Sequence, residues 1–169
     1  MADLNTRERL QPSLLDRLTD LAPDSKRETF EQQTLGWQQL RQAVLRDLAW
    51  LLNTTNLAAL EDLDTAPLAA ASTVNYGIPG FAGLVGTTDR MATLEAGIAA
   101  AIRTFEPRIR PDTLAVRVRE ATEDKPTPAI LFEISGELWA QPVPQQLFLE
   151  TAIDLETGLA TVGDARAPG

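Results

Sequence analysis

The side chains in this sequence that could perform acid–base chemistry are carboxylates, because histidine and cysteine are both absent. Their absence removes the commonest general base, the commonest metal ligand and every thiol nucleophile. Two carboxylates would suffice to hydrolyse a glycosidic bond. Nothing in their spacing selects a pair among the candidates, which are Glu95, Glu106, Glu133, Glu137 and Glu150. We therefore predict a protein that is not an enzyme, with a peptidoglycan hydrolase as the alternative.

The sequence predicts neither a cofactor nor a metal site. Asp62-Leu63-Asp64 lacks the spaced oxygen ligands and the glycine of a calcium-binding loop. No glycine-rich phosphate loop ends in Lys-Ser or Lys-Thr, and no dinucleotide-binding glycine motif follows a predicted strand. We expect the protein to act without a cofactor.

The most informative charged residues are Glu106 and Arg108, which flank Pro107. The residue before a proline is pushed out of the helical region, so Pro107 ends the helix predicted before it. We expect Glu106 and Arg108 to reach separate partners and not each other. The alternative is that each is satisfied inside its own domain. We expect Glu106→Ala and Arg108→Ala to fold but to be defective in assembly.

The overall charge argues against nucleic acid or anionic membrane as the main partner. The formal net charge is -9, with 24 acidic and 15 basic residues, whereas phosphate binding depends on clustered lysine and arginine. The sequence begins without the apolar block of a secretory signal. No stretch approaches the roughly 20 apolar residues of a membrane span. We expect a cytoplasmic protein.

Residues 1–33 are predicted to form an N-terminal arm, because they are mostly polar and are interrupted by two prolines. Within the arm, Ser13 is suited to cap about two turns of helix. This short helix places Leu14, Leu15 and Leu18 on one face. It either packs on its own domain or docks on a partner, and we expect the arm to become ordered on a partner.

Two longer helices are predicted from apolar residues spaced by three and four. They span about residues 34–53 and 89–105. Trp50 falls on the face of the first helix opposite its apolar stripe, together with Ala43. It is therefore either covered by the arm or offered to another protein. Between the helices, residues 55–88 are predicted to form a loop with a shaped turn at 72–79.

The rest of the domain is predicted to be β-structure. Alternating apolar residues indicate strands near 114–119, 130–140 and 147–154, and a turn at 156–158 precedes a short end that could pair. Two helices followed by hairpin-connected strands predict an α+β domain with an antiparallel sheet, spanning residues 34–162. Residues 163–169 are expected to be frayed.

An open sheet edge is expected at 147–154, the longest run of this region without proline. Phe148 and Glu150 are the outward positions of this run, and we expect a partner strand to be added there.

Five segments of the chain together resemble the TssE family of type VI secretion baseplate subunits. This family is itself similar to the small wedge protein of contractile-phage baseplates, and it is often labelled lysozyme-like. The segments follow one another in order along the chain: SLLDRL at 13–18, RDLAWLLN at 46–53, STVNYGIP at 72–79, IRTFEPRI at 102–109, and FEISG at 132–136 with DLETG at 154–158.

The resemblance implies a small α+β wedge subunit without catalytic turnover. It implies assembly with the baseplate subunits TssF and TssG, near TssK, at the inner membrane complex. It also implies that the platform starts the contractile sheath of TssB and TssC. Carried over by position, Glu106, Pro107 and Arg108 would be the assembly motif of the family. A phage-like tail baseplate protein is the alternative within the same superfamily.

Overall fold

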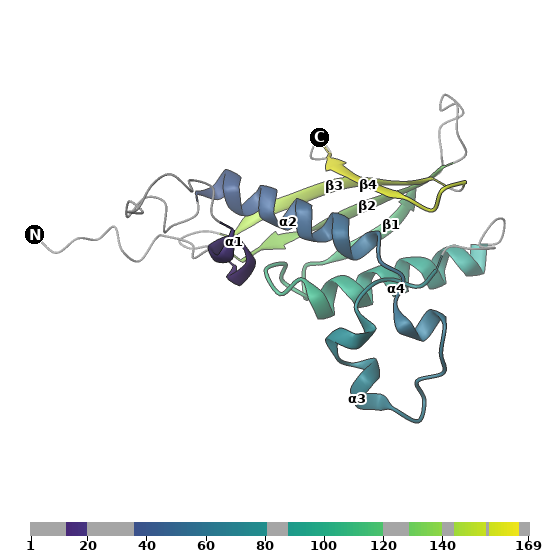
Figure 1. Cartoon of the computed structure of the whole chain (residues 1–169). Helices are drawn as coiled ribbons and strands as arrows, with labels where there is room; N and C mark the ends of the chain where they lie inside the picture. Colours follow the sequence, from purple (N-terminus) through teal and green to yellow (C-terminus); the bar gives the residue numbers. More distant parts are fainter. Residues whose placement is uncertain are drawn as a thin grey trace, which may run out of the picture.

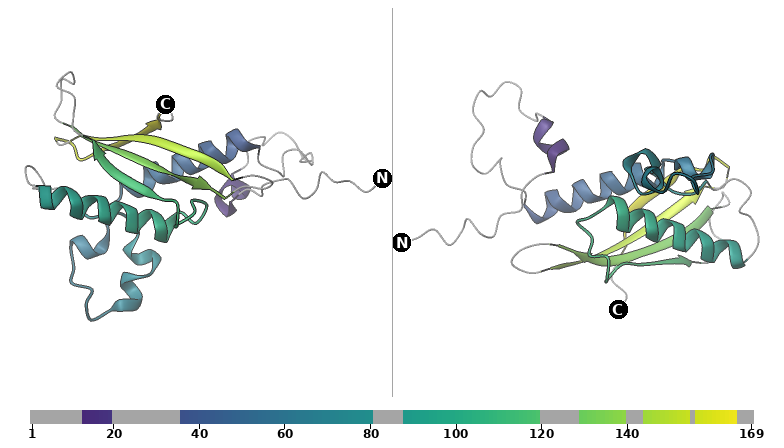
Figure 2. Two further views of the ribbon diagram at one scale, coloured as in Figure 1. Left: turned by 180° about the vertical axis from the view of Figure 1, so that it is seen from behind. Right: turned by 90° about the horizontal axis from the view of Figure 1, so that it is seen from below.

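The computed structural model describes residues 13–19, 36–80, 88–119, 129–139, 144–154 and 156–165, with only the backbone described at 88–90. Its two long helices lie against one face of a four-stranded antiparallel sheet (Figures 1 and 2). The predicted α+β class is confirmed. The predicted arm lies outside the described residues except for its short helix.

The first long helix, α2 (Trp37–Leu52), forms because its apolar residues recur on one face. Gly36 precedes it and donates its backbone N–H to Gln39 Oε1 at 2.9 Å. The buried stripe consists of Leu40, Ala43, Val44, Leu48, Leu51 and Leu52. Ala43 therefore belongs to the buried side, contrary to expectation, because the apolar face is wide enough to include this small residue.

The second long helix, α4 (Thr88–Phe105), buries Leu94, Ile98 and Ile102. It ends before Pro107, as predicted. The short helix α1 (Leu14–Leu18) is also confirmed, and Ser13 caps it by accepting the backbone N–H of Asp16 at 3.3 Å.

The sheet has the strand order β1-β2-β3-β4, and every neighbouring pair is antiparallel. The strands are β1 (Ala115–Arg119), β2 (Ala129–Leu138), β3 (Gln145–Asp154) and β4 (Ala160–Asp164). Gly163 and Asp164, which were expected in a frayed tail, belong to β4 and pair with Glu150 and Leu149. The tail prediction is wrong at these two positions, because the β3–β4 ladder extends through them.

The core lies between the sheet and the two long helices. On β2 and β3 the inner face contributes Phe132, Ile134, Leu147, Leu149 and Ile153, all fully buried. They pack with the buried stripes of α2 and α4 in one cluster. Burying a large apolar side chain stabilises the fold by about 1.5–3 kcal/mol, so this cluster accounts for the packing of the two layers.

The segment between the long helices is more ordered than the predicted loop. It contains the 3-10 helices η2 (Leu57–Ala59) and η3 (Thr73–Asn75) and the single-turn helix α3 (Pro67–Ala70). The predicted shaped turn is confirmed at Gly77, which has a φ of 126°. A Cβ on Gly77 would lie 2.3 Å from Thr54 O, so only glycine fits this close approach.

Candidate interaction site

The turn after α4 brings Glu106 and Arg108 together. Ile109 donates its N–H to Glu106 O at 3.1 Å, which closes a tight turn around Pro107. Arg108 then reaches back with two contacts, from Nε to Glu106 Oε1 at 2.6 Å and from Nη2 to Glu106 Oε2 at 2.5 Å. The expectation that these side chains reach separate partners is wrong, because Arg108 binds both oxygens of Glu106. Residues two apart share a side even on an extended chain, and the turn brings these two into contact. Pro107 itself is exposed on the turn.

Asp47 of α2 is the second acceptor for Arg108, whose Nη2 lies 2.5 Å from Asp47 Oδ2. The other oxygen of Asp47 accepts from Arg46 Nε at 2.8 Å, and Arg46 Nη1 donates to Asp16 Oδ1 at 2.7 Å. We call these five residues (Asp16, Arg46, Asp47, Glu106 and Arg108) the charge network. The sequence analysis did not identify Asp47, although it lies in one of the segments that carry the resemblance.

The charge network stabilises the ionised form of Arg108. Burial disfavours its charge, but the hydrogen bonds and negative charge of Glu106, followed by those of Asp47, outweigh the burial and raise the pKa of Arg108. The side chain of Glu106 is only 3% exposed. A buried carboxylate requires such a partner, so Arg108 is part of the internal structure of the domain.

Tyr76 lies beside the charge network. Its ring meets Phe105 of α4 edge-on, with centroids 5.1 Å apart. Burial is the largest cause that raises the pKa of Tyr76 above its usual 10.0, and the negative charges of Asp47 and Glu106 add to it. The Asn-Tyr-Gly turn is thereby connected to the turn after α4.

The predicted arm helix is held by charge and presents its leucines to solvent. No residue of α1 is buried, and Leu14, Leu15 and Leu18 are 72%, 44% and 74% exposed. The described contact that attaches α1 to α2 is the Asp16–Arg46 ion pair. The structure therefore does not support packing of this helix on its own domain.

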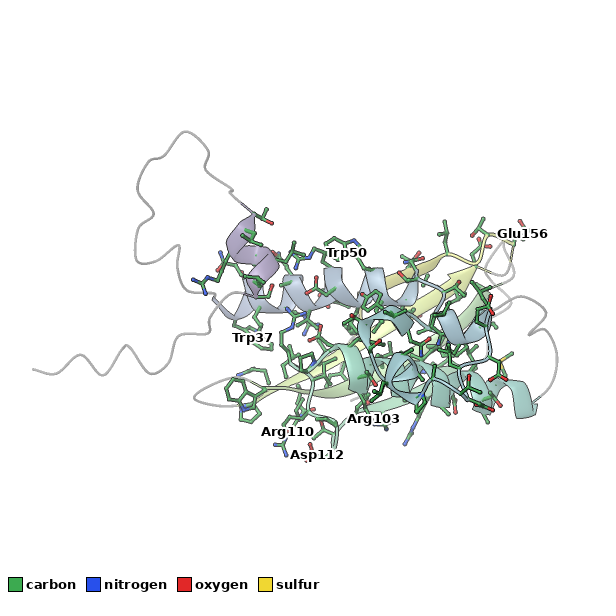
Figure 3. The ribbon with its side chains drawn as sticks, turned by 60° about the horizontal axis from the view of Figure 1, so that its bottom comes forward. Trp37, Trp50, Arg103, Arg110, Asp112 and Glu156 are labelled. Atoms are coloured by element: carbon green, nitrogen blue, oxygen red, sulfur yellow. The ribbon has the colours of Figure 1, made fainter. Side chains whose placement is uncertain are left out.

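Trp50 is half exposed, at 51%, on the outer side of α2. The guanidinium carbon of Arg46 lies 5.1 Å from the centre of its ring, a cation–π contact. Figure 3 shows Trp50 on the same side of α2 as α1. Arg46 thus contacts both Asp16 and Trp50, so α1 and the indole lie on the same side of α2.

Phe148 and Glu150 lie apart from these residues. They are on the outer face of the sheet, opposite Ser135 and Glu133 of β2. The predicted edge at 147–154 is wrong, because β3 pairs with β2 on one side and with β4 on the other. Five residues separate the end of β3 from the start of β4, which is enough for the chain to return along β3. The absence of proline from 147–154 gave no sign of this pairing.

The two actual edges of the sheet are partly closed by side chains from α2, from Asn53 directly after it, and from α4. At β4, Asn53 donates to Ala160 O and accepts from Ala160 N, both at 2.9 Å. Further along β4, Arg41 binds Asp164. At β1, Glu95 accepts the N–H of Val118 at 2.5 Å. Such contacts protect an edge against unspecific pairing.

Among the described residues, no group of three potential metal ligands occurs. Glu106 is their one buried carboxylate, and Arg108 binds both of its oxygens. In the same part of the chain, no helix is long and apolar enough to cross a membrane.

Fold and contacts define a small two-layer α+β domain in which an arginine–carboxylate network connects the arm helix, α2 and the turn after α4. A family model described as baseplate wedge protein gp25 matches residues 38–143. The match covers more than half of the chain, so the chain belongs to this family. It includes α2 from its second residue onward, all of α4 and the Glu106–Arg108 turn. A search among curated proteins found no match. Membership supports a structural role in a phage-like tail baseplate.

Proposed function

We propose that this chain is a non-catalytic structural subunit of a type VI secretion baseplate wedge. It assembles with TssF and TssG, near TssK, in the cytoplasm at the inner membrane complex. The observation that carries this proposal is the charge network, in which Arg108 occupies both oxygens of the buried Glu106. The pairing makes the Glu-Pro-Arg turn a rigid joint between α2 and α4, as a scaffold requires. Two further observations support the proposal. The five segments that resemble the TssE family occur in order along the chain, and the chain belongs to the baseplate wedge family.

The partner surface nearest to this joint combines the leucines of α1 with Trp50. Exposed apolar groups in a contiguous region mark protein interaction sites, and tryptophan is enriched among the residues that dominate binding energy. Asp16 and Arg46 set the position of α1 relative to Trp50. We assign this surface to contact with TssF and TssG.

Sheath assembly would begin by addition of a strand to one edge of the sheet. Ala160 turns its N–H and C=O away from β3, so by alternation Val162 does so as well. In β1, Val118 turns its N–H away from β2, so Val116 does the same. Val116 and Val162 are therefore the positions at which a TssB or TssC strand would find free backbone groups.

The sheath role is tested by proline at these two positions. A proline there removes only an N–H that faces away from the ladder, which edge strands tolerate. Either Val116→Pro or Val162→Pro should join the baseplate yet abolish extended fluorescent sheaths in cells that lack the wild-type gene. Normal sheaths with both stable variants would rule out strand addition. The earlier candidates, Phe148 and Glu150, are unsuitable because proline within β3 would disturb two ladders.

A phage-like tail baseplate role is the second candidate, and the description of the matching family favours it. Genes for sheath and inner-tube proteins beside this one would fit both roles. A membrane-complex gene and a ClpV-type ATPase gene would identify the secretion system. Clearing of a cell-wall suspension by the purified protein would instead favour a peptidoglycan hydrolase.

A further inference from the structure

Residues 56–76 form a lobe that projects from the body of the domain. Figure 1 shows α3 at its far end, away from the sheet. The lobe contains η2, α3 and η3, and none of these three elements has a buried residue. It is therefore an outgrowth without a hydrophobic core of its own.

Hydrogen bonds of side-chain amides hold the lobe together in place of a core. Asn75 Nδ2 donates to Ala70 O at 3.0 Å, and Asn75 Oδ1 accepts the N–H of Ala58 at 2.9 Å. One side chain thus connects η2, α3 and η3. Asn56 caps η2 by accepting the N–H of Ala59 at 3.0 Å. The lobe is a defined structure, so the positions of its outward side chains are fixed.

Those outward side chains include three large apolar residues. Leu60, Leu68 and Val74 are 75%, 87% and 66% exposed. Each comes from a different part of the lobe, at the end of η2, in α3 and in η3. Exposed apolar side chains mark an interaction surface where they gather into one patch rimmed by polar groups.

The charged residues of the lobe are all acidic. Glu61, Asp62 and Asp64 are exposed, and the sequence contains no lysine or arginine between Arg46 and Arg90. Within the described part of the chain, none of these three carboxylates takes part in an ion pair. A partner that covers the leucines must therefore also meet unpaired negative charge.

We propose that the lobe is a docking surface for a protein segment that carries both basic and apolar side chains. Basic residues complement the three carboxylates, and the apolar residues cover Leu60, Leu68 and Val74. Nucleic acid and anionic membranes are repelled by the same carboxylates. Two lobes of neighbouring copies would repel each other for the same reason. This surface is separate from α1, Trp50 and the sheet edges, and the proposal does not depend on the secretion role.

A photo-crosslinking side chain at position 68 of the full-length chain tests the proposal in the host cell. The expected adduct joins position 68 to a segment of another protein that contains lysine or arginine together with apolar residues, as identified by mass spectrometry. The double variant Glu61→Lys/Asp62→Lys should reduce the yield roughly tenfold. Glu156→Lys, on the exposed β3–β4 turn, is the charge control and should leave the yield unchanged.

The same crosslinker at position 159 is the matched positional control, since Leu159 is 60% exposed but lies outside the lobe. It should not produce the adduct seen from position 68. An adduct with a second copy of this chain, an adduct with a segment lacking basic residues, or no adduct would overturn the proposal. So would a yield that survives the double charge reversal in a variant whose thermal unfolding is unchanged.

Discussion

Arg108 Nη2 lies 2.5 Å from Asp47 Oδ2, although the two residues are 61 positions apart in the chain. Through this contact the turn that follows α4 is fastened to the middle of α2. The same guanidinium holds both oxygens of Glu106. Arg108 therefore closes the turn on Glu106 and ties that turn to α2.

Replacing Arg108 by alanine should destabilise the fold, in contrast to the expectation from sequence alone. The change leaves Glu106 as a buried carboxylate without its partner, which costs about 3–5 kcal/mol. Urea unfolding followed by circular dichroism measures the loss. Arg108→Lys should recover only part of it, because lysine cannot donate in the same two-pronged way.

Arg110→Ala provides the control for that experiment, because Arg110 pairs at the surface with the exposed Asp112 and the partly exposed Glu137, and surface ion pairs contribute little to stability. It should unfold like the wild type. If Arg108→Ala also had wild-type stability, the charge network would not stabilise the fold. The original expectation, that Arg108 binds a partner directly, would then be favoured.

Besides burial, the pKa of Tyr76 depends on two members of the charge network, Asp47 and Glu106. Titration of Tyr76 in the wild-type protein therefore measures their effect. Tyr76 is the one tyrosine in the sequence, so tyrosinate absorbance on raising the pH belongs to it alone. Its pKa should lie above 10.0 in the folded protein and return to the ordinary value in urea. The folded state holds the proton more tightly, so this contribution to stability is complete below pH 10.0 and is lost as the pH rises through the folded pKa.

Asp47→Asn should lower the pKa of Tyr76, since it removes one of the two negative charges that raise it. A midpoint unaffected by Asp47→Asn would show that burial alone is responsible.

The amide of Asn53 should stabilise the sheet by pairing with the edge of β4. Asn53→Ala removes two hydrogen bonds to Ala160, at a cost of roughly 1–3 kcal/mol in the free energy of unfolding. Hydrogen exchange should become faster along β4 than along β2. Asn53→Asp keeps the acceptor for Ala160 N–H but loses the donor to Ala160 O, so an intermediate loss is expected. Equal stability of all three proteins would contradict the assignment.

Lowering the pH should detach α1 from α2, because protonation of Asp16 breaks its ion pair with Arg46. Burial opposes ionisation of Asp16, but the Ser13 hydroxyl and Arg46 outweigh it, so the pKa of Asp16 lies below its usual 3.8. The attachment is therefore complete above pH 3.8 and is lost as the pH falls through the lowered value. Asp16→Asn should expose the amides of residues 14–18 to exchange at neutral pH and change global stability by about 1 kcal/mol or less. Unchanged protection in this variant would mean that contacts other than the ion pair hold α1.

Local patterns were sufficient to predict most of the fold. The spacing of apolar residues located α2 and α4 within a few residues, and Ser13 and Pro107 marked a helix start and a helix end through effects of neighbouring residues. Alternation located the strands. Strand order was not predictable, because pairing of β3 with β4 depends on the return of the chain and not on the composition of either strand.

The sequence analysis identified most residues of the candidate site but not the contacts between them. Glu106 and Arg108 were identified, yet their mutual pairing depends on a turn whose dihedral angles the sequence does not specify. Asp47 was missed because an exposed-looking acid on a helix carries no sign of a partner 61 positions away. Long-range ion pairs of this kind become visible only when the packing of the helices is known.

The central claim is that this chain is a wedge subunit of a type VI secretion baseplate, and co-purification with TssF and TssG tests it most directly. Tagged TssG, co-expressed with TssF and the full-length chain, should retain the chain through size-exclusion chromatography. Deletion of residues 1–30, or Trp50→Ala together with Leu18→Ser, should weaken retention while the thermal midpoint stays within a few degrees of the wild type. Failure of the folded, full-length chain to associate with TssF and TssG would contradict the claim.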